Sequence, residues 1–583
     1  TVVKLTASLG MLVALPQLAD AIFGSSNRLA PPALFLNPNH VYARLGSYPL
    51  NGLEISTVIV TGGMVILFGV LIRYTPIGLQ MRAVVESPRL AELSGIRSSE
   101  VGIVSWALSS FTAGLAGVLL APLFAQLNSL NFTTLLVSAV AAAAFGGFIS
   151  IPLALVGGIF LGVGQQVIGG YLPSNTVLAQ GLRPGFPFLV LLVLLIVLPS
   201  LRSLHVTADP LSPCDPPPPS TAAPHASIAT ASIVRTWWIA ILAFVVGSCV
   251  TWIPHNWVDN FSQAMIFAII FLSITLLTGM SGQISLAQMT FAGIGAFTAG
   301  HLASTHLGLP VLIGTLVGGC IAAGLGALVA LPSLRLGGLS LALLTLAFAL
   351  LADNVVFPYS WAGNGSTGVN VPRPQIGSID FSNSRPFFVL VLTILALCAF
   401  GVYMIRRGTT GMYLAAIRGS ELAASSIGIN VSKSKIIVFS VSAFIAGIGG
   451  GLYGSFQSTV SPNDFVYFFS LIFVVVVMIV GSRTVGGAIQ AGFAYVLIAQ
   501  ALNLSFLPKW VNSFEPVLFG LAALTFVTHP EGVFEHVRKI SVVAIESAIE
   551  RRRNGRIDRR TRGASQDGTG TGNISRVADA RPS

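Results

Sequence analysis

The chain is dominated by apolar segments of about twenty residues, which are separated by more polar loops. As a helix, a segment of this length crosses the roughly 30 Å hydrocarbon core of a bilayer. Hydrophobic residues make up 54% of the 583 residues and charged residues 9%, about one third of the charged share usual in soluble proteins. The sequence therefore excludes an ordinary cytosolic enzyme and predicts an all-α, polytopic membrane protein.

The apolar segments fall into two blocks, with about sixteen candidate transmembrane helices in all. In the first block we expect helices at 1–24, 54–73, 101–121, 132–149, 151–170 and 186–201. In the second block we expect them at 235–253, 262–278, 283–301, 309–331, 338–356, 386–405, 435–457, 466–481, 484–504 and 511–528. Several are Gly-rich or closely spaced, so one or two are candidates for re-entrant or broken helices.

The stretch between the blocks contains CDPPPPSTAAPHAS and is unsuited to a membrane helix, because proline removes backbone donors. We therefore divide the chain into a first half (1–202), a Pro-rich linker (203–234), a second half (235–535) and a basic, partly disordered tail (536–583). The first half opens at Thr1 directly in an apolar stretch without a recognisable signal peptide, so we expect the true start of the protein upstream.

Basic residues set the predicted orientation, because cytoplasmic loops carry an excess of Lys and Arg. Two loops are rich in them, 74–100 and 406–434. Alternating the helices outward from these loops also places the linker and the C-terminal tail in the cytoplasm, and it puts 254–261 and 357–385 on the external side. Loop placement thus explains the net charge of +11 without a nucleic-acid partner.

An internal repeat relates the two halves. Residues 78–117 and 411–450 align without a gap, at the constant offset of 333 that separates Gly78 from Gly411. The identical pairs include Gly78/Gly411, Ala83/Ala416, Ala91/Ala424, Gly95/Gly428, Ile96/Ile429, Ser99/Ser432, Phe111/Phe444, Gly114/Gly447 and Gly117/Gly450. Shared membrane composition does not account for matches inside a polar loop, so we interpret the halves as related.

Each copy of the repeat predicts a short amphipathic helix in its cytoplasmic loop. Apolar or small residues recur there at helical spacing, and they are Leu90, Ala91 and Leu93 in one copy and Leu422, Ala423 and Ala424 in the other. Gly95 and Gly428 then fit the residue that caps the helix before the chain turns back into the bilayer.

Glycines of the second half are expected to let helices approach closely. They cluster in two predicted spans, as Gly293, Gly295 and Gly300, and as Gly447, Gly449, Gly450, Gly451 and Gly454.

Motifs in both halves carry a resemblance to a known family. The second half contains GQISLAQMTFAGIGAFTAG (282–300), LRLGGLSLALLTLAF (334–348), WAGNGSTGV (361–369) and HPEGVFE (529–535), and the first half contains AFGGFISIPLALVGGIFLG (144–162). Together with the repeated loop, which resembles an EAA-like coupling loop, these motifs are similar to those of branched-chain amino acid ABC transporter permeases. The first half looks like the H-type subunit of that family and the second half like the M-type.

The chain departs from the family pattern at a few places. Ala287 stands where the family usually has glycine, and Gly481 and Ser482 stand where it has two glycines. Against the family pattern, we also expect the H-type half to lack its first few helices and so to be truncated at its N-terminus. These differences leave fine substrate specificity open.

The resemblance implies two homologous helical permease halves that catalyse no reaction and hold no cofactor or metal. Its partners would be two ABC ATPase subunits, which bind the ATP, an extracytoplasmic solute-binding protein and the lipid of a bacterial inner membrane. The sequence agrees, since its 583 residues contain no Gly-x-x-x-x-Gly-Lys-Ser/Thr loop for phosphate.

Coupling to the ATPases would fall to the repeated loop. The residues concerned are Gly78, Arg82, Ala91, Gly95, Gly411, Arg418, Glu421, Ala424 and Gly428. Among them we expect Arg82, Arg418 and Glu421 to make polar contacts with the ATPases, although setting the topology is an alternative role for these charges.

A substrate pathway would be lined by modest hydrogen-bonding groups. The candidates are Gln283, Ser285 and Gln288, then Thr345 on a facing helix, and Gln165 and Gln166 in the first half. Ser285 and Gln288 are three residues apart and would share a helix face. Helix–helix hydrogen bonds are the alternative role for each. Such a pathway suits a zwitterion with an apolar side chain, and also urea, short amides or a nucleoside.

Other function classes find little support. An ion-coupled secondary transporter needs ionisable groups at mid-membrane, but Asp20, Asp353 and Glu515 lie near predicted outer ends. A membrane hydrolase needs a nucleophile with a base or clustered metal ligands, and His301 and His306 form no HExxH motif.

Overall fold

The computed structural model describes residues 2–24, 28–29, 31, 40–45, 48–124, 126–127, 129–173, 176–197, 254–304, 310–334, 338–376, 379–502, 518 and 522. They belong to one compact unit, formed by 1–216 and 252–533. The predicted linker, the basic tail, the predicted span at 235–253 and nearly all of the one at 511–528 lie outside the described residues.

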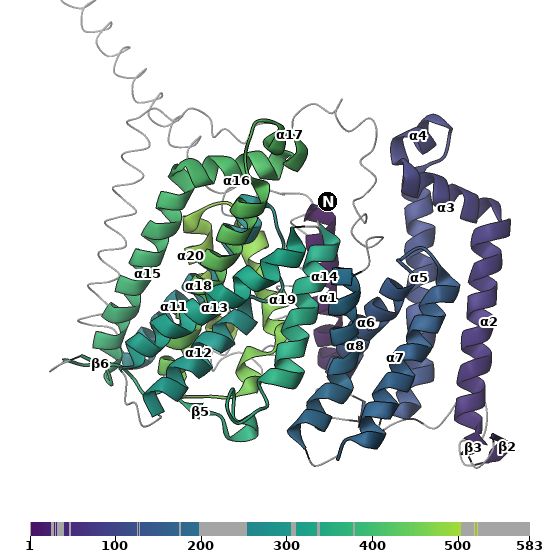
Figure 1. The fold of residues 1–583 in the computed structure, drawn as a ribbon, viewed down its shortest axis with the longest axis horizontal. Helices are drawn as coiled ribbons and strands as arrows, with labels where there is room; N and C mark the ends of the chain where they lie inside the picture. Colours follow the sequence, from purple (N-terminus) through teal and green to yellow (C-terminus); the bar gives the residue numbers. More distant parts are fainter. Residues whose placement is uncertain are drawn as a thin grey trace, which may run out of the picture. The chain divides into compact units, whose positions relative to one another are not determined.

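The first half consists of helices joined by short connections (Figure 1). Its helices are α1 (Val2–Phe23), α2 (Gly52–Tyr74), α3 (Pro76–Glu86), α4 (Pro88–Leu93), α5 (Ser98–Leu120), the 3-10 turn η1 (Ala121–Leu123), α6 (Ser129–Phe145), α7 (Ile151–Tyr171) and α8 (Val177–Val197). Two antiparallel ladders connect them, β1 (Arg28–Leu29) with β4 (Gln126–Leu127) and β2 (Val41–Leu45) with β3 (Tyr48–Asn51).

The second half is also helical. Its helices are α11 (His255–Ile274) with the π-helix η3 (Thr275–Met280), α12 (Gln288–Ser304), α13 (Val311–Ser333), α14 (Leu339–Leu351) with the π-helix η4 (Ala352–Val356), η5 (Gly365–Thr367), α15 (Ser384–Arg407), α16 (Thr409–Gly419), α17 (Glu421–Ser426), α18 (Val431–Gln457), η6 (Pro462–Phe465), α19 (Tyr467–Val480) and α20 (Val485–Leu502). Short antiparallel ladders pair β5 (Val369–Asn370) with β8 (Thr459–Val460) and β6 (Gln375–Ile376) with β7 (Ile379–Asp380).

The helical membrane fold is confirmed, but sixteen spans are not. Within the described residues, 10 helices are long and apolar enough to cross a membrane. The other described helices at predicted spans, α1, α6, α12 and α14, are not among these ten. α12 is short because it begins only at Gln288, after a non-helical stretch at 282–287 that was predicted to be helical from 283.

The core of the second half forms around α18, which packs against α11, α12 and α13. Glycines make the crossing with α12 possible, as predicted. A Cβ atom built on Gly450 would lie 1.8 Å from the carbonyl oxygen of Ala292, and one on Gly295 would lie 2.0 Å from that of Gly447. Because neither position has room for a methyl group, the two backbones are in direct contact.

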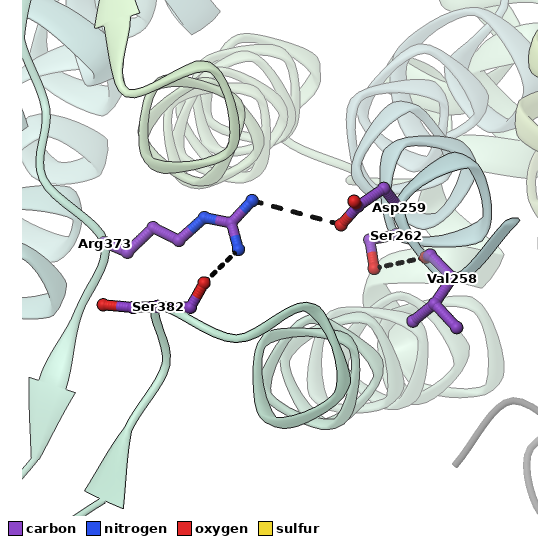
Figure 2. Close-up of polar contacts among 5 residues, drawn as sticks. All are labelled: Val258, Asp259, Ser262, Arg373 and Ser382. Carbon is purple, nitrogen blue, oxygen red and sulfur yellow. Dashed lines mark hydrogen bonds and ion pairs between the residues drawn. The ribbon is translucent and has the colours of Figure 1, made fainter. Parts of the chain in front are cut away.

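A polar cluster ties the connection between α14 and α15 to the start of α11 (Figure 2). Arg373 donates from Nη1 to the carbonyl oxygen of Ser382 at 2.7 Å, and its Nη2 lies 4.0 Å from Oδ1 of Asp259. The guanidinium also stands over the ring of Phe387, 5.1 Å from its centre. One arginine thus holds the first turns of α11 and α15 together, on the predicted external side.

Candidate functional site

The repeated loop folds into the same pair of helices twice. We call α3–α4 and α16–α17 the repeated helix pairs. In each, an eleven-residue helix and a six-residue helix are joined by a single serine, Ser87 or Ser420. Each serine has an extended backbone and accepts a hydrogen bond from the amide three residues on, Leu90 or Ala423. This is N-capping, which satisfies one of the open donors of the short helix.

The first glycine of each copy lets the pair turn tightly against the helix that precedes it. A Cβ on Gly78 would lie 2.4 Å from the carbonyl oxygen of Ile72, and one on Gly411 would lie 2.2 Å from that of Arg406. Any side chain at these positions would push the pair away from the end of its membrane helix.

The second glycine ends the short helix as predicted. Gly95 has φ of +85° and Gly428 has +86°, a left-handed conformation that glycine adopts at no steric cost. The next amide then bonds back into the helix, from Ile96 to the Ala91 carbonyl at 2.9 Å and from Ile429 to the Ala424 carbonyl at 3.1 Å. The expected short helix and its cap are therefore present in both copies.

The predicted apolar face of the short helices is only partly buried, because one alanine of each helix is buried and the leucines in α4 are exposed. Ala91 and Ala424 are buried, whereas Leu90 and Leu93 are exposed, Leu93 by 80%. Met412 and Tyr413 of α16 are exposed as well. Apolar side chains on the outside of a connecting helix are typical of a surface that binds another protein.

The three predicted polar contact residues lie in different settings. Arg82 is exposed. Glu421 is half-exposed, and its carboxylate accepts from Nζ of Lys435 at 2.8 Å, while Lys435 itself is only 3% exposed. Arg418 is exposed as a residue, but its guanidinium donates to the carbonyl oxygen of Gly279. Partial burial and then the charge of Arg483 lower the pKa of Arg418. The polar contact of Arg418 with an ATPase stays a prediction.

Three of the predicted pathway residues surround a break in the membrane helices. α11 ends in the π-helix Thr275–Met280, and the chain is not helical from 282 to 287 before α12 begins. Ser285 lies in this non-helical stretch, so the predicted helix face shared with Gln288 is wrong. The stretch is buried in the protein core, where unpaired backbone groups are costly.

We call residues 281–287 the unwound segment. Side chains from neighbouring helices accept hydrogen bonds from one amide of this segment and from one amide at the start of α12. Thr345 of α14 accepts from the Leu286 amide at 3.0 Å, and Ser470 of α19 accepts from the Met289 amide at 2.9 Å. Thr345 also donates to the Ala342 carbonyl. The predicted proximity of Thr345 to this segment is confirmed, and its hydroxyl is occupied by backbone groups.

Gln288 forms a closed hydrogen-bond network between three helices. Its Oε1 accepts from the hydroxyl of Ser273 at 3.0 Å, and its Nε2 donates to the hydroxyl of Ser442 at 3.1 Å. Ser442 in turn donates to the Ser273 carbonyl at 2.9 Å. All three side chains are fully buried, so the helix–helix role applies to Gln288.

Gln283 is the opposite case. The residue is 7% exposed, yet neither amide atom of its side chain has a hydrogen-bond partner among the described residues. Three buried hydroxyls near it also have no hydrogen-bond partner among the described residues. Thr275 and Thr278 lie in the π-helix, and Thr290 lies at the start of α12. Buried polar groups are nearly always paired, so this group points to water or a solute between the helices. Gln283 remains a pathway candidate.

The two glutamines give a direct test. We expect Gln288→Ala to lower the free energy of unfolding by about 1–3 kcal/mol, because Ser273 and Ser442 lose their partner. Gln283→Leu should leave thermal stability unchanged or higher while lowering uptake. Melting curves of the purified variants, beside initial uptake rates, check both. Equal destabilisation by the two changes would contradict the distinction.

The first-half candidates lie together on α7. Gln165 is half-buried, and Gln166 is exposed and accepts from Nη2 of Arg183 on α8 at 3.3 Å.

Of the two histidines considered as hydrolase residues, the structure describes His301. Nε2 of His301 lies 2.7 Å from the carbonyl oxygen of Ala362. His306 is outside the described residues, among which no group of three or more His, Cys, Asp or Glu could hold a metal ion.

A cavity of about 290 Å³ lies among helices of the second half, and sequence reasoning missed it. Its aromatic wall consists of Phe267, Tyr453, Phe469, Phe473 and Tyr495, and polar groups come from Gln263, Asn463, Asp464 and Gln500. These residues belong to five separate elements, α11, α18, η6, α19 and α20. No motif joins them, although aromatic residues repeated along otherwise aliphatic helices were a signal.

Known proteins resemble the chain over most of its length. A family described as "Branched-chain amino acid transport system / permease component" matches residues 12–198 and 256–524. The permease protein LivM of the high-affinity branched-chain amino acid transport system is 26% identical over 307 residues in Salmonella typhimurium (48% of this chain, 70% of LivM) and 26% over 312 in Escherichia coli (49% and 72%). LivH of Escherichia coli is 29% identical over 175 residues (30% of this chain, 56% of LivH). The chain thus spans about half the length of LivH.

Proposed function

Because the chain belongs to the family of branched-chain amino acid transport permease components, we propose that it is a two-in-one permease. It would form the membrane path of an ABC importer, with its first half acting as the H-type subunit and its second half as the M-type. The LivM-like and LivH-like matches to its two halves support this fusion.

The duplicated helix pair, α3–α4 and α16–α17, is the main support for this proposal. Two copies with the same serine cap, the same crowded glycine and the same left-handed glycine give two equivalent surfaces. Each surface would receive one of two ATPase subunits, and the exposed apolar side chains of α4 and α16 would lie in the contacts. ATP would be bound by those subunits, since the 583 residues contain no phosphate-binding loop of the Gly-Lys-Ser/Thr type.

The aromatic cavity supports an apolar amino acid as the substrate. Asp464 offers a carboxylate for an α-ammonium group, and the amides of Gln263, Asn463 and Gln500 offer donors for an α-carboxylate. The aromatic wall would take the branched side chain. We propose that an extracytoplasmic binding protein delivers the substrate, and that the chain lies in a bacterial inner membrane with its C-terminus in the cytoplasm. Urea, short amides and nucleosides lack this combination of two charges and an apolar end.

Reconstitution into proteoliposomes with the cognate ATPases and binding protein tests the proposal. Uptake of leucine should require ATP, stop with vanadate and persist with an uncoupler. An ion-coupled secondary transporter predicts the reverse, which is uptake without ATP that an uncoupler abolishes.

A further inference from the structure

Arg418 connects one repeated helix pair to the membrane core. It lies in the last turn of α16, next to the Ser420 cap that begins α17. Its guanidinium donates to the Gly279 carbonyl, and its side-chain stem packs on Gly282, where an added Cβ would lie 3.1 Å from Cγ of Arg418. The side chain therefore bridges a surface helix and the beginning of the unwound segment.

The Gly279 carbonyl is available because the helix ends there. Carbonyls in the last turn of a helix have no intrahelical partner, and a cationic side chain is favourable at this end. Gly279 is itself held in place, since a Cβ on it would lie 1.7 Å from the Ser482 carbonyl oxygen between α19 and α20. A displacement of α16 would thus reach a backbone that has little freedom to absorb it.

The unwound segment is the element that would respond. It begins two residues after Gly279, includes Gln283 with its unpaired buried amide, and continues to the amides that Thr345 and Ser470 hold. π-Helical turns such as Thr275–Met280 are rare and are often found at functional sites. Arg418 is in contact with both ends of the turn that leads into this segment, through Gly279 and Gly282.

At the position equivalent to Arg418, the other repeated helix pair has no such connection among the described residues. At the offset of 333 that relates the copies, Arg418 corresponds to Val85, whose side chain is 77% exposed. The Glu421–Lys435 ion pair is also specific to the second half, because the corresponding residues are Pro88 and Gly102. Two helix pairs with the same backbone are therefore tied differently to their membrane helices.

We propose that Arg418 is a positioning residue that transmits movement of α16–α17 to the unwound segment 281–287, and that the two halves therefore couple unequally to the ATPases. This inference rests on the proposed function. It adds that the second half carries the direct mechanical link, whereas the first half serves mainly as a docking site.

Paired variants at equivalent positions test the inference. In proteoliposomes with the ATPases and binding protein, Arg418→Gln should lower ATP-driven leucine uptake by about tenfold, a typical size for coupling between sites. ATPase subunits should still co-purify, and ATP hydrolysis without substrate should stay within about twofold of wild type. Val85→Gln should lower uptake much less than Arg418→Gln does, because the exposed Val85 side chain makes no equivalent link. Equal losses in the two variants, or unchanged uptake in Arg418→Gln, would overturn the inference, as would loss of the ATPases from Arg418→Gln alone.

A covalent replacement of the link covers the case in which Arg418→Gln does not fold. The Cβ built on Gly282 lies 3.8 Å from Cβ of Arg418, a separation suited to a disulfide. Because Gly282 has φ of +75°, where a side chain is strained, Gly282→Cys alone sets the baseline of uptake. With the four native cysteines replaced by alanine, Gly282→Cys/Arg418→Cys should regain uptake on oxidation and lose it on reduction. Oxidised protein that is intact but remains inactive would contradict the inference. Absence of ATP-driven uptake in the wild-type protein would instead contradict the proposed function.

Discussion

Replacing Gly450 with alanine is expected to disrupt the core of the second half. The new methyl group would lie 1.8 Å from the Ala292 carbonyl oxygen and 2.5 Å from its Cα. Because both are backbone atoms of α12, no side-chain rotation relieves the overlap and the helices must separate. We expect a loss of about 3 kcal/mol, at the upper end for overpacking, and a melting temperature lower by roughly 10 °C.

The repeat supplies the matched control. Gly117 occupies the equivalent position in the first half, and no atom of the described residues lies within 4 Å of a Cβ built on it. Gly117→Ala should leave stability unchanged or raise it by up to about 1 kcal/mol, since alanine favours a helix. Melting of detergent-solubilised protein, followed by tryptophan fluorescence, separates the two variants. Similar behaviour of both would show that the contact of α12 with α18 does not depend on glycine at position 450.

Removing the carboxylate of Glu421 is expected to loosen the second repeated helix pair. Lys435 is buried, and its Nζ donates to Glu421 at 2.8 Å. Glu421→Ala leaves this ammonium without its partner, at a cost of about 1.5–3 kcal/mol. We expect faster hydrogen exchange in α17 and weaker retention of ATPase subunits. Adding Lys435→Met should reverse the loss of stability, because replacing both partners by apolar groups is close to neutral.

An exposed ion pair in the first half serves as the comparison. Arg97 and Glu100 are joined at 2.5 Å with both side chains mostly exposed. Glu100→Ala should therefore cost less than about 1 kcal/mol. If Glu421→Ala is as mild as Glu100→Ala, or if the double variant is as unstable as Glu421→Ala, the ion pair does not hold α17 in place.

Local features were predictable from the sequence because they depend on nearby residues. The caps of the short helices follow from Gly95 and Gly428, and the close approach of α12 and α18 follows from clustered glycines. The repeat supports the predicted caps, because glycines with the same backbone conformation recur at the offset of 333. Hydrophobic length likewise identified most membrane helices.

Features that depend on distant residues were not predictable. The prediction of a helix at Ser285 was wrong. The amides of Leu286 and Met289 are bonded to Thr345 and Ser470 instead, and these two partners are far away in sequence. The contact of Arg418 depends on the carbonyl oxygen of Gly279, which is 139 residues away in sequence. The aromatic cavity required five elements to converge. Hydrophobic periodicity contains no information on any of these contacts.

Crosslinking tests whether both repeated helix pairs contact ATPase subunits. Ala91 and Ala424 are buried, so the probes belong at Leu93 and at Ser426, which is exposed and equivalent at the same offset. With the native cysteines replaced, Leu93→Cys and Ser426→Cys should each capture an ATPase subunit through a short bifunctional reagent in membranes that transport leucine. Capture by neither position, in membranes where ATP-driven uptake continues, would contradict the account.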